Sequence, residues 1–118
     1  MELVLKLLIV VVALLHFWFL ILEMFFWRKP LGLKVFHMSQ QKADDSAVLA
    51  ANQGLYNGFL VAGLIWGLVS ASFAIQLFFL SCVVIAGIFG AITVHRRVFF
   101  VQALPALLAL MVLFLIWS

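Results

Sequence analysis

Four apolar runs occupy almost the whole chain, and each is long enough to cross a lipid bilayer. A membrane-spanning helix needs roughly 20 consecutive, mostly apolar residues. The runs are Leu3 to Trp27, Val48 to Ser70, Phe73 to Val94 and Val98 to Trp117. With 69% hydrophobic and 9% charged residues, the 118-residue chain is too apolar for a soluble domain. The sequence therefore predicts an all-α membrane protein, a transmembrane four-helix antiparallel bundle that forms a single domain over residues 1–118.

Basic residues collect in alternate connections between the runs. Six of the seven Lys and Arg residues lie between runs one and two or between runs three and four: Arg28, Lys29, Lys34, Lys42, Arg96 and Arg97. The opposite side has only Lys6. Because short connections rich in Lys and Arg stay in the cytoplasm, both termini are predicted to lie outside a bacterial inner membrane. The juxtamembrane position of these charges also argues against nucleic acid as a partner.

The first connection, residues 28–47, contains the signals that separate runs one and two. Pro30 cannot continue a helix because it lacks an N–H group and its ring clashes with the preceding turn. Asp45 or Ser46 is expected to cap the second helix. The segment Val35 to Met38 is expected to form a turn at the membrane interface.

The other two connections are very short, and small residues mark the helices that they join. The connections near Ala71 to Gln76 and His95 to Arg97 predict antiparallel hairpins between consecutive helices. Stripes of small residues let helices approach closely in lipid. These residues are Gly54, Gly58 and Ala62 on run two, and Cys82, Ala86, Gly87, Gly90 and Ala91 on run three. They are interpreted as packing positions within one chain, with a homodimer interface as the alternative.

Polar side chains recur at a shared depth near the predicted cytoplasmic side. His16 and Glu23 are seven residues apart, so they differ by only about 20° around a helix. Polar groups are costly in hydrocarbon, and several at one depth indicate an internal chamber. The residues expected to wall this inner-leaflet chamber are His16, Glu23, Asn52, Gln53, Tyr56, Asn57 and Gln102.

Glu23 is the most informative member of this group. It can accept a proton, pair with a cationic ligand or act as a general acid. The alternative is a structural carboxyl that Asn57 or Tyr56 satisfies, and that only keeps runs one and two in register. The histidines are too dispersed for the three or four close ligands that zinc prefers, so no metal site is predicted, and no motif names a cofactor.

Several sequence segments resemble those of one protein family. The segments are His16 with Leu22-Glu23-Met24-Phe25, then Ala51-Asn52-Gln53-Gly54-Leu55-Tyr56-Asn57-Gly58-Phe59, then Ala86 to Ala91 and Gln102 to Ala106. They are similar to those of small bacterial four-span membrane proteins catalogued as a domain of unknown function. The resemblance covers essentially the whole chain and implies a four-helix membrane fold, but it implies no activity, substrate or cofactor.

Three functions fit this pattern. The first is binding of a small amphipathic or cationic molecule, with membrane lipid around the protein and with proton-coupled transport as an extension. The second is a membrane enzyme acting on a lipid or isoprenoid-like substrate. The third is a non-catalytic assembly or sensor subunit whose polar cluster only specifies helix pairing.

Overall fold

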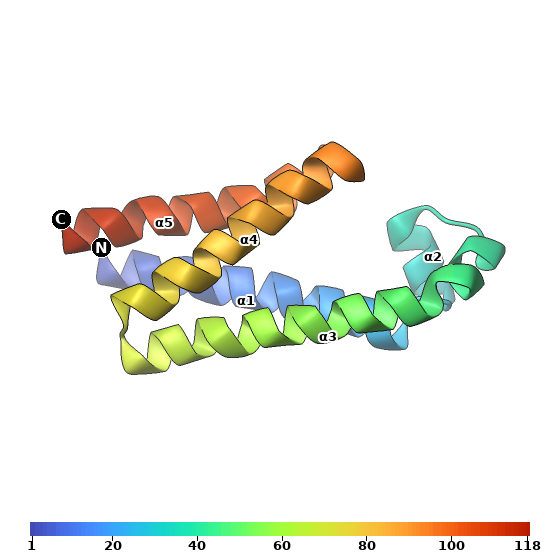
Figure 1. Cartoon of the computed structure of the whole chain (residues 1–118), viewed down its shortest axis with the longest axis horizontal. Helices are drawn as coiled ribbons and strands as arrows, with labels where there is room; N and C mark the ends of the chain where they lie inside the picture. The colour runs from blue at the N-terminus through green and yellow to red at the C-terminus, as the bar shows by residue number, and fades with distance from the viewer. The chain divides into compact units, whose positions relative to one another are not determined.

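The computed structural model describes all 118 residues, and its regular structure is entirely helical (Figure 1). The elements are α1 (Glu2–Phe25), α2 (Pro30–Phe36), α3 (Gln40–Ser70), α4 (Phe73–Thr93), the π-helix η1 (Phe99–Ala103) and α5 (Leu104–Trp117). Four helical stretches are long and apolar enough to cross a membrane: Glu2–Phe25, Gln40–Ser70, Phe73–Thr93 and Phe99–Trp117. The expectation of an all-α bundle with four long apolar helices is confirmed.

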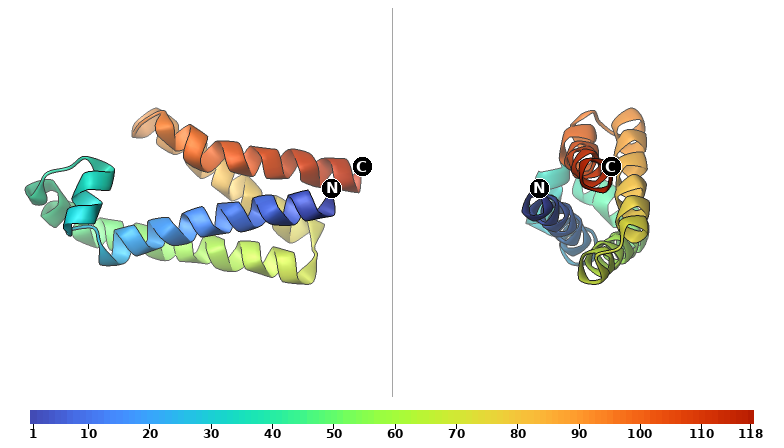
Figure 2. Two further views of the ribbon diagram at one scale, coloured as in Figure 1. Left: turned by 180° about the vertical axis from the view of Figure 1, so that it is seen from behind. Right: turned by 90° about the vertical axis from the view of Figure 1, so that its left-hand side faces the viewer.

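The chain divides into two compact units, and α1 and α3 each contribute to both. The first unit contains residues 1–15 and 60–118, and the second contains residues 16–59. The N-terminus and the C-terminus both belong to the first unit and lie at the same end of it (Figure 2).

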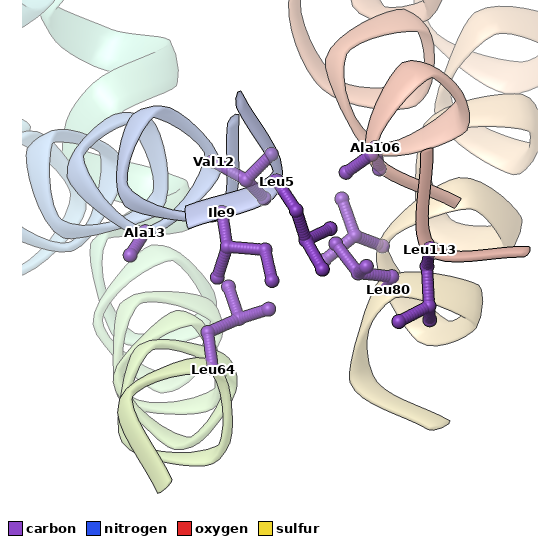
Figure 3. Close-up of a cluster of buried hydrophobic side chains, with 10 residues drawn as sticks. Leu5, Ile9, Val12, Ala13, Leu64, Leu80, Ala106 and Leu113 are labelled. Carbon is purple, nitrogen blue, oxygen red and sulfur yellow. The ribbon is translucent and has the colours of Figure 1, made fainter. Parts of the chain in front are cut away.

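Buried aliphatic side chains from four helices form the core of the first unit (Figure 3). On α1, the buried residues Leu5, Ile9 and Val12 follow a spacing of four and three residues, which places them on one helical face. Ile9 points toward Leu64 of α3. The core is completed by Ala13, Leu80, Val83, Ala106, Ala109 and Leu113. Because lipid offers helices no hydrophobic drive to associate, this interdigitated packing supplies the attraction between them.

A two-residue turn joins α3 to α4. Ala71 adopts a left-handed backbone conformation with a φ of 49°, which ends α3. The Ser72 N–H donates to the Gly67 carbonyl at 3.2 Å, and the Ser72 hydroxyl accepts from the Ile75 N–H at 3.2 Å. The buried Gln76 side chain donates to the Gly67 carbonyl at 2.9 Å. These bonds satisfy backbone groups at both helix ends, and the predicted hairpin is confirmed.

α4 contacts η1 and α5 to form the second hairpin of this unit. A Cβ atom built on Gly87 would lie 2.6 Å from the Ala103 nitrogen, so the two backbones meet at this glycine. Within η1 the Leu104 N–H donates to the Phe99 carbonyl. Pro105 follows directly and has no N–H group to donate to the carbonyl four residues earlier. The π-helical turn therefore lies next to a position where the α-helical hydrogen bonding is interrupted by proline.

In the second unit, α3 begins earlier than the sequence predicted. The Lys42 N–H donates to the Ser39 hydroxyl at 3.1 Å, so Ser39 caps the helix. The expected cap at Asp45 or Ser46 is wrong. Both lie inside the helix, where the Asp45 carboxylate accepts from Gln41 at 2.9 Å. The first residues of α3 are polar, and a helix boundary predicted from hydrophobicity alone therefore fell later in the chain.

The first connection contains a short helix, α2, which begins at Pro30. Gly32 is buried, and a Cβ atom there would lie 2.6 Å from the Trp27 carbonyl oxygen. The Trp27 and Phe36 rings lie 4.8 Å apart between centroids. His37, with a φ of 52°, ends the helix. α2 therefore folds back against the residues that follow α1.

Candidate functional site

The site centres on a hydrogen bond between α1 and α3 within the second unit. The Asn57 Nδ2 atom donates to Glu23 Oε1 at 2.5 Å. Asn57 is only 4% exposed, and Glu23 is half-buried. The expectation that the Glu23 carboxyl faces an amide of the second apolar run is confirmed.

A small residue brings the two helices close enough for this bond. A Cβ atom on Gly54 would lie 2.5 Å from Met24 Cγ and 3.2 Å from Glu23 Cβ. Within the second unit, the buried residues of α3 follow spacings of seven, four and three: Ala43, Ala50, Gly54 and Asn57. The buried face of α3 is therefore narrow and lined by small side chains, and Asn57 is its main polar member.

His16 is fully buried on α1. Its ring lies 5.5 Å from the Phe19 ring in an edge-to-face arrangement. It lies seven positions before Glu23 on the same helix, a rise of about 10 Å. The two side chains therefore occupy one helix at different depths.

Three of the predicted chamber residues are exposed in the structure. Asn52, Gln53 and Tyr56 lie on the surface of α3, and Tyr56 is 51% exposed, with its ring 5.9 Å from that of Phe59. The structure brings Asn57 to Glu23 but does not bring these three side chains to that contact. A step of one residue turns a helix by about 100°, and the buried face passes through Gly54 instead of Gln53.

Gln102 belongs to the first unit, where it is half-buried within η1. All residues of the site described here belong to the second unit. No group of three or more His, Cys, Asp or Glu side chains gathers in a way that could hold a metal ion.

A hollow of about 500 Å³ lies beside Glu23 in the second unit. It is lined by Glu23, Met24, Phe25, Trp27, Arg28, Lys29, Asp44, Ala47, Val48 and Ala51. The α3 members are spaced by three, four and seven residues from Asp44, so they share one helical face. The hollow thus combines two carboxylates, two basic groups and an apolar wall.

The sequence reasoning missed most of this lining. It assigned Arg28 and Lys29 to membrane topology and gave Asp44 no binding role. The available signal was the position of Arg28 and Lys29 five and six residues after Glu23, just beyond the end of the same helix. Their approach to Asp44 depends on how the chain turns back after α1, which hydrophobic periodicity does not specify.

Two side-chain contacts hold the turn after α1 against the start of α3. The Trp27 indole donates to the Ser46 hydroxyl at 3.1 Å. The Gln40 amide donates to the Arg28 carbonyl at 3.3 Å and to the Asp44 carboxylate at 2.9 Å. These bonds join the two sides of the hollow and keep its charged rim in place.

Comparison with known proteins gives the chain a family. Residues 10–114 match the family described as "Protein of unknown function (DUF1304)". The chain belongs to this family. It is 32% identical over 103 residues to the "Uncharacterized protein YpaA" of Lactococcus lactis subsp. lactis (strain IL1403), covering 84% of this chain and 87% of that protein. No solved structure matches the chain. The match confirms the resemblance to a family of unknown function, and the four apolar helices make the chain a multi-pass membrane protein.

Proposed function

We propose that this protein binds a small amphipathic molecule whose polar end bears an amine. The observation that carries the proposal is the Glu23 carboxyl, which Asn57 holds at the edge of the hollow. Asp44 supplies a second carboxylate for the amine, while Arg28 and Lys29 suit a neighbouring phosphate or carboxylate. A zwitterionic head attached to an apolar chain satisfies all of these groups.

The apolar wall supports an amphipathic ligand over a free, fully polar one. Met24 and Phe25 of α1 and Val48 of α3 line the hollow and are exposed in the free chain. An apolar wall of this kind suits an alkyl chain and would leave the groups of a fully polar ligand without hydrogen-bond partners. In a membrane, the alkyl chain of the ligand lies along the helices while its head occupies the hollow.

Glu23→Gln tests this assignment. Glutamine keeps an oxygen that accepts from Asn57 but cannot pair with an amine, so the variant is expected to fold normally and lose binding by roughly tenfold or more. The probe is lysophosphatidylethanolamine added to protein in micelles, with the thermal shift as the readout. Lysophosphatidylglycerol, which lacks the amine, tests the charge preference.

Glu2→Gln is the matched control, because Glu2 lies on the same helix but outside the hollow. It is expected to keep the full lipid-dependent shift. The proposal fails if Glu23→Gln and Glu2→Gln respond alike, or if wild type does not distinguish the two lysolipids.

Transport coupled to proton movement is an extension of the same proposal. Glu23 is a titratable carboxyl inside a membrane helix, the kind of group that transporters use to exchange a proton for a cation. Four helices in one copy leave little room for an alternating pathway, so transport requires two chains.

The competing function is a fixed structural link between α1 and α3. That link predicts a large loss of stability in Asn57 variants but no effect of Glu23→Gln on lipid binding.

We further propose that the protein lies in a bacterial inner membrane with both termini outside. The support is the charge distribution, because six of the seven Lys and Arg residues fall in the two connections on one side. A cysteine at position 96, in a Cys82→Ser background, is expected to resist membrane-impermeant maleimide in intact cells and react after permeabilisation. A cysteine at Ser118 is expected to react in intact cells. The reverse pattern would refute this orientation.

A further inference from the structure

α2 carries two partly exposed aliphatic side chains on one face. Leu31 and Val35 are 39% and 41% exposed, and they lie four residues apart on one face of this helix. Lys34 is exposed beside them. The inner side is fixed by the close approach of Gly32 to the Trp27 carbonyl and by the contact between the Trp27 and Phe36 rings. The apolar outer face is therefore held in one orientation.

The segment that contains α2 is rich in exposed basic residues. Arg28, Lys29, Lys34 and Lys42 are all exposed on the segment between the end of α1 and the first turn of α3. The acidic groups of the same segment are Asp44 and Asp45, and each accepts a hydrogen bond from a glutamine four residues earlier. The segment thus carries an excess of positive charge beside exposed aliphatic side chains.

We propose that this segment docks onto the anionic headgroups of the bilayer surface, with Leu31 and Val35 inserted at the interface. Basic residues clustered in the segment that follows a membrane-spanning helix attract anionic lipids. A short helix with aliphatic residues on one face and lysine beside them suits the boundary between headgroups and acyl chains.

The length of the chain favours lipid over a protein partner. Only four residues separate Phe25 from Pro30, so α2 begins within about 18 Å of the end of α1. At the other side, α3 is about 46 Å long, which exceeds the hydrocarbon thickness of roughly 30 Å. Its first turns therefore extend to headgroup level, where Lys42 meets lipid phosphates. Both ends of the segment are anchored at the membrane surface.

The experiment places an environment-sensitive fluorophore on α2 in the full-length protein. The protein carries Val35→Cys in a Cys82→Ser background and is reconstituted into nanodiscs of phosphatidylcholine, alone or mixed with phosphatidylglycerol. The label is expected to be protected from acrylamide in the anionic nanodiscs and more accessible in the neutral ones. High salt is expected to reduce the difference because it screens the surface charge. Equal accessibility in both lipids would overturn the proposal.

Lys34→Gln with Lys42→Gln tests the charges without touching the hollow, since neither residue lines it. Each removed charge is expected to weaken docking by about fivefold. The matched control is Arg96→Gln with Arg97→Gln, which removes two charges from the other basic connection and is expected to leave the label protected. If the control exposes the label as strongly as the Lys34→Gln, Lys42→Gln variant does, the net charge of the protein and not this segment causes the protection. The proposal would then be wrong. A label at Leu31 repeats the test should Val35→Cys reduce thermal stability.

Discussion

Replacing Asn57 with leucine is expected to lower the free energy of unfolding by about 3 kcal/mol. Asn57 is 4% exposed, and its amide donates to the Glu23 carboxyl. Leucine would leave this half-buried carboxyl facing an apolar side chain with its donor removed, and losing one partner costs more than the bond itself contributes. Unfolding in detergent, followed by circular dichroism, measures the loss. The lysophosphatidylethanolamine shift is expected to disappear as well.

Asn52→Leu is the matched control for this prediction. The same substitution is made on the same helix, but Asn52 is exposed, so we expect a change within about 0.5 kcal/mol. Replacing Glu23 and Asn57 together by leucine is expected to recover much of the stability, because no unpaired polar group then remains. Wild-type stability of Asn57→Leu, or a double variant no better than the single one, would contradict the pairing.

Gly87→Ala is expected to destabilise the first unit by about 2–3 kcal/mol, although the same change inside a helix normally stabilises it. The added Cβ would lie 2.6 Å from the nitrogen and 2.7 Å from the Cβ of Ala103. These atoms belong to η1 and cannot rotate away, so the contact between α4 and η1 must open. The midpoint of thermal unfolding in detergent measures the effect.

Gly58→Ala provides the comparison within the second unit. Its added Cβ would lie 3.0 Å from Leu20 Cδ1, the end of a flexible side chain that can move aside. We expect this variant to be as stable as wild type or slightly more stable, because alanine favours the helix. Equal losses in both variants would show that the close approach of Gly87 to Ala103 is not what makes glycine necessary.

Hydrophobic periodicity and length predicted the helices better than their ends. The short hairpin turn after Ser70 follows from the distance between two apolar runs, and the structure confirms it. The start of α3 at Gln40 and the presence of α2 were missed, because both depend on polar segments. Ser39 is a suitable cap by residue type, but Ser46 and Asp45 are equally suitable, and only the hydrogen bond to the Lys42 N–H identifies the one that is used.

The candidate site was also predicted only in part. The free-energy cost of placing polar side chains in lipid singled out Glu23 in the sequence. The structure gives Glu23 the expected amide partner, Asn57. The same arguments grouped Asn52, Gln53 and Tyr56 with that pair, yet these three side chains are exposed. Polarity ranks residues by the cost of burying them, whereas the side of the helix that is buried depends on where small residues allow contact.

The sequence by itself determined that this chain forms four membrane-crossing helices, because so many apolar residues in runs of this length have no stable alternative in water. It also determined that an ionisable residue near the end of the first helix needs a partner. Only the tertiary structure decided that the partner is Asn57 and that Arg28, Lys29 and Asp44 share a hollow with Glu23. The physical reason is that helix azimuth and chain reversal depend on close packing at Gly54 and Gly32, which no single helix specifies alone.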